Sequence, residues 1–336
     1  SEKLEKYKIS KDDFVIAMTG ATIGKIGRLN ENITAIVNQR VAKIVPKKNT
    51  DKKFVYYSIH GEDFQTFVQN NIDSNSAQEN ISGTSISRYC ILLPPFHEQR
   101  AIASVLGSLD DKIDLLNREN QTLEQTAETI FRQWFIEEAN EEWEEGTIAN
   151  MLDILPGFPF KSELFTELGK YCLITIKSVQ DGRLDISKTD KINDIPSRMP
   201  NYCYLKLGDI LLSLTGNVGR CCLVDVNNAL LNQRVAKLFA KNSRDMAYTY
   251  IYFRMEKTKR LLEEMAKGTA QPNLSPVETL RIKMRIPPKS KLELFSSKSN
   301  PIIKRILCNK MQIRTLEKLR DTLLPKLMSG EVRVKL

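Results

Sequence analysis

The six residues Asn38-Gln39-Arg40-Val41-Ala42-Lys43 decide the organisation of this chain, because the same hexapeptide returns unchanged at residues 232–237. The sequence on either side of it also matches, and in the same order. The matching pairs are Asp13 and Asp209, residues 18–24 and 214–219, residues 77–82 and 270–275, and Pro94-Pro95 and Pro287-Pro288. A repeat with so long a period predicts a duplicated domain rather than a solenoid of short units.

Each copy has the same layout, in which a mixed globular part is followed by Pro-Pro and then by a long helical segment. Apolar runs at residues 13–18 and 209–214 predict strands, and periodic segments near 54–70 and 246–266 predict short amphipathic helices. The predicted fold class is therefore α+β, with two repeated globular domains separated by two long helices.

The predicted boundaries are residues 1–95 for the first globular domain, 96–142 for the first long helix, 143–290 for the second globular domain, and 291–336 for the second long helix and tail. The two copies differ at their starts, because residues 146–196 have no counterpart before Ser1. We therefore expect the first globular domain to lack its opening segment, either because the domain is truncated or because the sequence given begins inside it.

Both helical segments carry an apolar stripe with alternating three- and four-residue steps, which is typical of a coiled coil. The stripes read Ile102, Leu106, Leu109, Ile113, Leu116, Asn120, Leu123, Ala127, Ile130 and Trp134, then Ile302, Ile306, Asn309, Ile313, Leu316, Arg320, Leu323 and Leu327. Each stripe contains an interior Asn, which can fix the register of a coiled coil at a cost in stability. Pro325 is expected to limit the regularity of the second helix near its end.

Charge separates the two helical segments. Residues 96–145 hold 4 Lys and Arg against 13 Asp and Glu, whereas residues 291–336 hold 11 against 4. Opposite signs favour pairing of the two helices with each other, as an antiparallel coiled coil. Apolar burial must still supply most of the stability, because an exposed ion pair contributes only about 0.2–1 kcal/mol.

The remaining charge lies on the globular parts. The chain has a formal net charge of +9 and a pI of about 9.1. Residues 1–95 carry +3 and residues 146–290 carry +8, while the two helical segments nearly cancel. Two basic globular domains joined by a rod of helices suit a ligand with two separated anionic sites, and duplex DNA is the obvious one. The alternative is a basic surface that is merely solvated.

No residues combine into a predicted catalytic or metal site. The six cysteines lack CxxC spacing and only His60 and His97 accompany them, so zinc has no ligand set. The Gly-rich run at residues 20–25 is one residue too short for a phosphate loop, and Ile26 stands where that loop needs Ser or Thr. His97-Glu98 suits a helix start, because an acidic residue there complements the helix dipole.

The expected compartment is the cytoplasm. No apolar run reaches the roughly 18 residues that a membrane span needs, and residues 1–6 do not have the apolar core of a signal peptide. The cysteines are accordingly expected to be reduced thiols without a chemical role.

Further motifs flank and fill the helices. They are Leu93-Pro94-Pro95-Phe96-His97-Glu98-Gln99-Arg100-Ala101-Ile102-Ala103, Leu109-Asp110-Asp111-Lys112-Ile113-Asp114, Phe131-Arg132-Gln133-Trp134-Phe135, and Leu319-Arg320-Asp321-Thr322-Leu323-Leu324-Pro325-Lys326-Leu327-Met328-Ser329-Gly330-Glu331. With these motifs the chain resembles the specificity (S) subunit of type I DNA restriction-modification systems over essentially its whole length. It departs from the motif at residues 289–291, where Lys-Ser-Lys replaces Phe-His-Glu.

The resemblance implies that the globular domains are target-recognition domains, each reading one half of a split DNA sequence. The paired helices would set the spacing and dock two modification (methyltransferase) subunits, with restriction subunits completing the complex. S-adenosylmethionine, ATP and Mg²⁺ would belong to those partners, so this chain would be non-catalytic and need no cofactor. The residues assigned to partner binding are Trp134, Phe135, Leu323 and Leu327. The alternatives are a stand-alone DNA-modifying enzyme and a coiled-coil scaffold without a nucleic-acid role.

Residues that are identical in both domains cannot encode two different half-sites. Arg40 and Arg234 are therefore better suited to phosphates or loop architecture, whereas base readout should lie where the copies diverge. The candidate DNA contacts are Lys25, Arg28, Arg40, Gln78, Asn217, Arg220, Arg234 and Gln271. The alternative role for the Asn-Gln pairs at 38–39 and 232–233 is hydrogen bonding within a turn.

Overall fold

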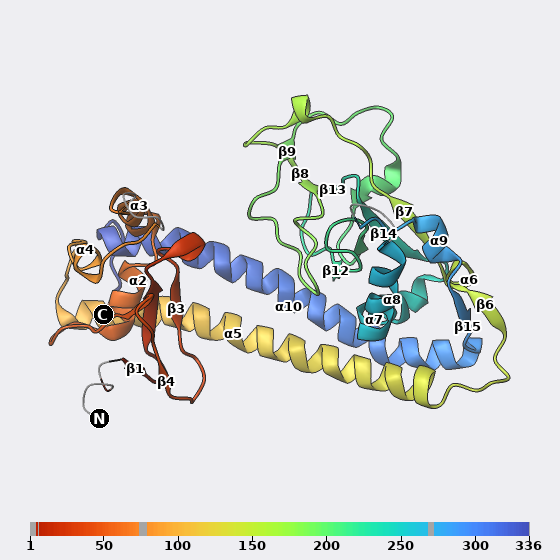
Figure 1. The fold of residues 1–336 in the computed structure, drawn as a ribbon, viewed down its shortest axis with the longest axis horizontal. Coiled ribbons are helices and arrows are strands. Elements are labelled where there is room, and N and C mark those ends of the chain that lie inside the picture. The colour runs from red at the N-terminus through yellow and green to blue at the C-terminus, as the bar shows by residue number, and fades with distance from the viewer. Residues whose placement is uncertain (1–4, 6, 74–78, 268–271, 336) are drawn as a thin grey trace. The chain divides into compact units, whose positions relative to one another are not determined.

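The computed structural model describes residues 5, 7–73, 79–267 and 272–335, and the chain divides into two compact units (Figure 1). Unit 1 contains the chain up to Asp114 together with Arg314–Leu336, and unit 2 contains Leu115–Ile313. Each unit therefore combines one globular lobe with a part of two long helices, α5 (Phe96–Arg132) and α10 (Lys289–Ser329).

The helices α5 and α10 run antiparallel to each other within both units. In unit 1 the Arg320 guanidinium lies 2.9 Å from the Asp110 carboxylate. In unit 2 Asn309 Nδ2 donates to Asn120 Oδ1 over 2.9 Å. A second contact in unit 1 joins Glu98 to Arg333 over 3.7 Å, and a second contact in unit 2 joins Glu138 to Lys291 over 3.2 Å. Within each unit, residue numbers therefore fall along one helix as they rise along the other, and the predicted antiparallel pairing is confirmed. The buried stripe includes Ile102, Leu106, Ile113, Leu116, Ala127, Ile306, Ile313 and Leu327.

The opposite charges of the two segments meet across this helix pair. Besides the Arg320 contact, the Arg305 guanidinium lies 2.8 Å from the Glu119 carboxylate, and Lys291 Nζ lies 3.2 Å from the Glu138 carboxylate just beyond α5. The side chains of Arg305 and Glu119 are 54% and 35% exposed. Because such exposed pairs contribute little, the apolar stripe carries most of the stability of the pairing.

The ends of the helices show two departures from a regular α-helix or from expectation. After Arg132, α5 continues as a π-helical turn, η2 (Gln133–Glu137). The helix α10 is unbroken at Pro325 and continues to Ser329, contrary to the expected irregularity. Pro325 is exposed, so the carbonyl of Asp321 that loses its N–H partner can be hydrated and the helix need not break.

The lobe of unit 1 is built on an antiparallel sheet in the order β3-β2-β5. Its strands and helices are β1 (Lys8–Ile9), β2 (Phe14–Ala17), η1 (Gly20–Thr22), β3 (Ile26–Arg28), β4 (Ala35–Ile36), β5 (Val41–Lys43), α2 (Lys52–Ser58), α3 (Glu62–Asn70) and α4 (Gly83–Ile86). Alternate residues of β2, Phe14 and Ile16, point inward and pack with Phe64 and Val68 of α3. This packing places the helices on one face of the sheet.

The start of α5 is tied to the lobe of unit 1. The buried Gln99 donates from Nε2 to Pro94 O over 2.8 Å, and its Oε1 accepts from Asp51 N over 2.9 Å. Asp51 in turn caps α2 by accepting from Phe54 N. Glu98 lies in the first turn of α5, as expected for a helix start.

The lobe of unit 2 contains two four-stranded sheets, β12-β11-β14-β7 and β10-β13-β8-β9, and the small pair β15-β6. Its elements are β6 (Glu145–Thr147), α6 (Ile148–Met151), β7 (Leu152–Pro156), η3 (Ser162–Leu164), β8 (Tyr171–Ile174), β9 (Lys191–Ile192), η4 (Asn201–Cys203), β10 (Tyr204–Leu205), β11 (Ile210–Ser213), β12 (Cys221–Leu223), β13 (Ala229–Leu231), β14 (Val235–Ala240), η5 (Ser243–Asp245), α7 (Met246–Arg254), α8 (Glu256–Ala266), α9 (Pro276–Leu280) and β15 (Lys283–Arg285). Two apolar cores result, because β11 is buried on both faces, with Leu212 in one core and Leu211 in the other.

The repeat in the sequence is a repeat in the structure. Strands β2, β3 and β5 of unit 1 correspond to β11, β12 and β14 of unit 2, with the same antiparallel order. The antiparallel pair β1-β4 of unit 1 likewise corresponds to β10-β13 of unit 2. Unit 2 adds β7 beside β14, and β8 and β9 beside β13, and these three strands come from residues 146–196. No strand pairs with the free edge of β5 among the described residues of unit 1.

None of the six cysteines, all of which lie within the described ranges, forms a disulfide bond. Cys203, Cys221 and Cys222 are buried, whereas Cys90 and Cys308 are exposed. Within the described ranges, no helix has the length and apolar character that a membrane crossing requires.

Candidate nucleic-acid interface

Three loops of unit 1 meet at the end of β2. Met18 follows the strand, donates from its backbone N to Arg40 O over 2.8 Å, and accepts at its own O from Ile81 N over 2.9 Å. Thr19 forms an isolated antiparallel bridge with Asn80. These bonds hold the loops after β2, before β5 and before α4 together, and we call this arrangement the loop cluster.

Unit 2 has the same loop cluster at the end of β11. Leu214 N donates to Arg234 O over 2.9 Å, and Leu214 O accepts from Leu274 N over 2.7 Å. Thr215 forms an isolated antiparallel bridge with Asn273, as Thr19 does with Asn80. The duplicated motifs therefore encode one backbone framework that is built twice.

Glycines with left-handed backbone make the turn of each loop cluster possible. The φ angles are +71° at Gly20 and +80° at Gly24 in unit 1, and +70° at Gly216 and +80° at Gly219 in unit 2. Residues with a Cβ adopt this region rarely. The matched φ angles show that both loops begin and end on equivalent left-handed glycines, although the loop of unit 2 is one residue shorter.

Lys25 and Arg220 occupy equivalent places in the two clusters. Lys25 O accepts from Ala17 N over 3.0 Å, and Arg220 O accepts from Ser213 N over 2.9 Å. Lys25 is exposed, whereas Arg220 is half-buried and donates from Nη1 to Gln180 Oε1. Asn217 is exposed at the tip of the loop in unit 2.

Arg40 and Arg234 are exposed and follow Asn-Gln in matching turns. Asn38 Oδ1 accepts from Arg40 N over 3.0 Å, and Asn232 Oδ1 accepts from Gln233 N over 2.7 Å. The turn hydrogen bonding considered as the alternative role of the Asn residues is thus present. It leaves the two arginine side chains on the surface beside the glycine loops.

The backbone of Arg234 is strained, with a φ of +69°. A bulky residue at positive φ is uncommon and costs about 1–3 kcal/mol, and such strain collects at functional sites. The strain places Arg234 among the strongest candidates for a binding role.

The structure does not bring Arg28 together with Lys25 and Arg40. Arg28 pairs with Phe14 across the sheet, at the end of β3 away from the loop cluster. Its guanidinium lies 2.6 Å from the Asp12 carboxylate. Burial opposes the charge, but the hydrogen bond to Asp12 raises the pKa of Arg28 above its usual value. Arg28 therefore has an internal partner at a different edge.

Sequence reasoning missed a buried ion pair that supports each cluster from the opposite end of the sheet. The Asp13 carboxylate lies 2.7 Å from Lys43 Nζ in unit 1, and the Asp209 carboxylate lies 2.8 Å from Lys237 Nζ in unit 2. Lys52 Nζ also lies 2.6 Å from Asp13. Burial opposes ionisation, yet the hydrogen bonds from Lys43 and Lys52 hold the pKa of Asp13 well below its usual range.

The sequence contained a signal for this ion pair. Both copies have an aspartate directly before the equivalent strand, β2 or β11, and both have the lysine that ends the hexapeptide. Lys43 and Lys237 form ion pairs with these buried carboxylates. The last residue of the repeated hexapeptide therefore has a structural role. Its middle residue, Arg40 or Arg234, is the exposed one.

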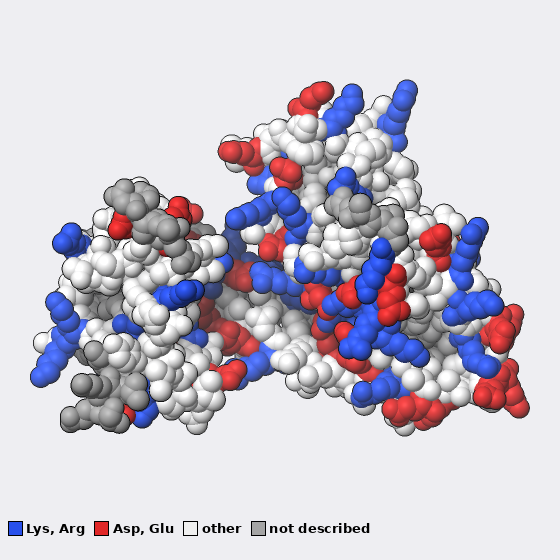
Figure 2. Space-filling view, viewed as in Figure 1, with Lys and Arg blue, Asp and Glu red and all other residues white. Residues whose placement is uncertain are grey.

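Two of the predicted contacts, Gln78 and Gln271, lie outside the residues that the structure describes. On the face of unit 2 that Figure 2 shows, the basic surplus does not form one unbroken patch. On this face, Lys and Arg side chains alternate with Asp and Glu (Figure 2). Interspersed charge of this kind favours local contacts of single basic side chains over a broad positive field.

The aromatic residues assigned to partner binding pack inside unit 2. The Trp134 ring lies 6.2 Å from the Phe295 ring in an edge-to-face arrangement, and the Phe135 ring lies 4.9 Å from the Tyr248 ring. Both side chains are half-buried against the larger core. Their packing gives them an internal role, and their contact with a partner stays a prediction.

Leu323 and Leu327 of α10 likewise pack inside unit 1. They contact the cluster that contains Phe54 and Tyr57 of α2 with Leu106 of α5. Leu327 is only 4% exposed, so it has little surface for a partner, and Leu323 is half-buried. A partner role for these leucines also stays a prediction.

Among the residues with a described position, no three His, Cys, Asp or Glu side chains are grouped so that they could hold a metal ion. The chemistry available at the loop clusters is hydrogen bonding and cation binding to a phosphate or a base edge.

Comparison with known proteins gives a family match over most of the chain. Residues 1–125 and 140–317 match the model of the type I restriction modification DNA specificity domain. The type I restriction enzyme MjaIX specificity subunit of Methanocaldococcus jannaschii is 26% identical over 347 residues, covering 96% of this chain and 78% of that protein. The HindI specificity subunit of Haemophilus influenzae is 20% identical over 326 residues, covering 75% and 71%.

A solved structure has the same fold. The S subunit of a type I restriction-modification system from M. genitalium matches with a TM-score of 0.55 and 19% sequence identity, over 96% of this chain and 84% of that chain. At this identity the match establishes shared architecture.

Proposed function

Since this chain belongs to the family of type I restriction modification DNA specificity domains and is a specificity subunit of such a system, we propose that each of its lobes reads one half of a bipartite DNA target. As a specificity subunit it is a recognition protein and not the enzyme of its complex. Its partners are DNA and the methyltransferase and restriction subunits of the system.

One observation carries the proposal. The two lobes repeat the backbone bonds that join the three loops of the loop cluster, while the side chains that it displays differ. Lys25 in unit 1 becomes Arg220 in unit 2, and Ala21 becomes Asn217. A repeated framework with exchanged polar side chains suits two readers of different sequences.

Within each cluster the residues divide into two roles. Arg40 and Arg234 are identical and exposed, so we assign them to phosphates, which lie at equivalent places whatever the sequence. Lys25, Asn217 and Arg220 differ between the copies, so we assign them to base edges, where Asn and Arg can form bidentate hydrogen bonds.

The finer organisation of the complex follows from the resemblance and is part of the proposal. Two modification subunits would dock on the helix pair, and S-adenosylmethionine, ATP and Mg²⁺ would be bound by partner subunits. The chain would act in the cytoplasm, where such a complex meets DNA.

The proposal is tested by producing the chain together with its methyltransferase subunits and sequencing the methylated bases of a random-sequence DNA library. We expect two short defined blocks separated by a gap of unspecified bases. Arg220→Ala should relax one block only, and Lys25→Ala should relax the other. The matched control is Arg260→Ala on α8, which removes an exposed arginine that pairs with Glu256 on the same helix.

Two results would contradict the proposal. One contiguous methylated site would show that the lobes do not read separate halves. Methylation by the complex without sequence preference would show that the loop clusters do not read bases at all.

A further inference from the structure

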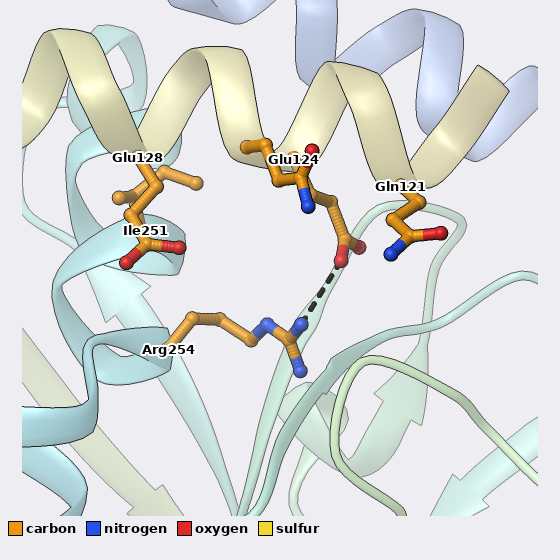
Figure 3. A pocket seen from close by; sticks show the side chains of 6 residues that line it. Gln121, Glu124, Glu128, Ile251 and Arg254 are labelled. Carbon is orange, nitrogen blue, oxygen red and sulfur yellow. Dashed lines mark hydrogen bonds and ion pairs between the residues drawn. The ribbon is translucent and has the colours of Figure 1, made fainter. Parts of the chain in front are cut away.

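The guanidinium of Arg254 joins two carboxylates that come from separate parts of unit 2. Arg254 ends α7, and its Nη2 donates to Glu124 Oε2 of α5 over 2.9 Å. Its Nη1 donates to Asp181 Oδ1 over 2.7 Å. Figure 3 shows the Arg254 side chain reaching from α7 toward Glu124, beside a pocket that Gln121 and Glu128 also line.

Asp181 lies at the tip of a tight turn that belongs to the second sheet region. The turn is closed by a bond from Gln180 N to Arg183 O over 2.9 Å. The residues that flank it, Val179 and Leu184, are 0% and 1% exposed and lie in the core of the second sheet. The position of Asp181 is therefore coupled to the position of that sheet.

Other cations hold the same turn from the side of the helices. Lys310 of α10 donates to Gly182 O and lies 3.8 Å from Glu124, and Lys259 of α8 lies 3.4 Å from Asp181. The turn is thus bound to α5 through Arg254, to α8 directly and to α10 directly.

Glu124 is itself fixed in place. Its Oε1 accepts from the hydroxyl of Tyr250, a residue with no exposed surface, over 3.2 Å. The Arg254 side chain is 21% exposed and the Glu124 side chain 24%. Burial opposes the charge of Arg254, but Tyr250, Glu124 and Asp181 raise its pKa above the usual value. Removal of Arg254 would take the bridging guanidinium from two partly buried carboxylates. Each would keep a more distant lysine, Lys310 at 3.8 Å from Glu124 and Lys259 at 3.4 Å from Asp181.

The turn also holds a predicted base contact. Arg220, which occupies the place of Lys25 in the cluster of unit 2, donates to Gln180 Oε1. Gly182 N in turn donates to Cys221 O over 2.9 Å, directly after Arg220. The turn therefore contacts both the side chain of Arg220 and the strand that begins directly after it.

We propose that Arg254 is a positioning residue for sequence readout, which sets the second sheet region and the Arg220 loop on the helix pair through Asp181 and Glu124. The inference rests on the proposed function and assigns a residue outside the loop clusters to the specificity of one half-site. Arg254 acts through Arg220 and does not itself touch DNA.

The test compares methylation motifs of complexes that contain the full chain with its methyltransferase subunits. Arg254→Met should relax the half-site that Arg220→Ala also relaxes, with methylation of mismatched sites rising about tenfold, while the other half-site stays unchanged. Arg254→Lys should recover only part of the specificity, because an ammonium cannot bridge both carboxylates as the planar fork does. Arg260→Met is the matched control and should leave both half-sites unchanged.

A second pair of variants distinguishes loss of the Arg254 contacts from general destabilisation of the fold. A Cβ at Gly182 would lie 2.7 Å from Arg254 Nη1, whereas a Cβ at Gly208 meets nothing closer than 3.4 Å. Both glycines have positive φ, at +73° and +87°, so Gly182→Ala and Gly208→Ala carry similar backbone strain. Only Gly182→Ala should relax the half-site.

Three outcomes separate the possibilities. Unchanged motifs in Arg254→Met and Gly182→Ala, with a bipartite motif in the wild type, would overturn the positioning role alone. Equal relaxation of both half-sites would overturn it too, because Arg254, Glu124 and Asp181 all lie in unit 2. A wild-type complex without a bipartite motif would instead overturn the proposed function.

Discussion

Asn309 of α10 donates a hydrogen bond from Nδ2 to Oδ1 of Asn120 of α5 over 2.9 Å, inside the apolar stripe of the helix pair. The two residues are 0% and 7% exposed. Asn309 Oδ1 has no hydrogen-bond partner among the described residues. A buried amide pair with one unsatisfied oxygen stabilises little, so its main effect is to select one register of the two helices.

Replacing one of these amides should destabilise the chain, and replacing both should not. Asn309→Leu leaves the Asn120 amide buried without its partner, and we expect a loss of about 1–3 kcal/mol in the free energy of unfolding by urea denaturation. The double variant with Asn120→Leu should recover the wild-type value or exceed it. Thr122→Leu on the exposed face of α5 is the control, expected within about 0.5 kcal/mol. A double variant as unstable as the single one would refute the role of the amides as a register pair.

The Asp13 ion pairs predict a pH dependence. Because the pKa of Asp13 is well below its usual range in the folded state, its stabilisation is fully present above the unfolded pKa of about 3.9 and is lost as the pH falls from there toward the lowered pKa. Asp13→Asn should therefore be less stable than the wild type at pH 7, by about 1–3 kcal/mol. Urea denaturation should show this difference shrinking below about pH 4. A difference that grows on acidification would contradict the ion pairs as its source.

The strained backbone of Arg234 predicts opposite effects on stability and binding. Arg234→Gly relieves a φ of +69° and should raise the free energy of unfolding by about 1 kcal/mol. If the Arg234 guanidinium neutralises one phosphate, its loss should make the plot of log DNA affinity against log salt concentration less steep by about 1. The methylated motif should stay the same. Fluorescence anisotropy across a salt series measures the slope. A changed motif would assign Arg234 to bases instead.

The equivalence of Lys25 and Arg220 predicts an exchange experiment. Lys25→Arg should alter the bases accepted in one half-site, and Arg220→Lys should alter those accepted in the other, each by about 1–3 kcal/mol of discrimination. Arg28→Lys, at the far edge of its sheet, should leave the motif unchanged because Arg28 pairs with Asp12. Methylated-base sequencing reads all three variants. A changed motif in Arg28→Lys alone would place the DNA interface of unit 1 at the end of the sheet opposite to the loop cluster.

Much of the fold could be predicted because its signals are local. The heptad stripe and the opposite charges of the helical segments predicted the antiparallel pair, and the contacts of Asp110 with Arg320 and of Asn120 with Asn309 bear this out. The strand runs at 13–18 and 209–214 became β2 and β11. The prediction that Pro325 would disturb the end of the second helix was wrong. A helix tolerates a proline where the proline is exposed to water, and the sequence alone does not show that exposure.

The candidate site was only partly predictable. Duplication identified Arg40, Arg234, Lys25 and Arg220, and the structure places each pair at the equivalent loop cluster. Arg28 lies apart from Lys25 and Arg40 because it ends β3, and the two ends of a strand lie at opposite ends of the sheet.

The sequence by itself determined that this chain is a duplicated α+β protein with two complementary helices, because repetition, periodicity and charge are read along the chain. Only the tertiary structure decided which charges neutralise one another and which remain on the surface. Lys43 and Lys237 are bound to buried carboxylates, and Arg254 meets Glu124 from 130 residues away. Such contacts depend on sheet register and on the approach of distant segments, which no local pattern encodes.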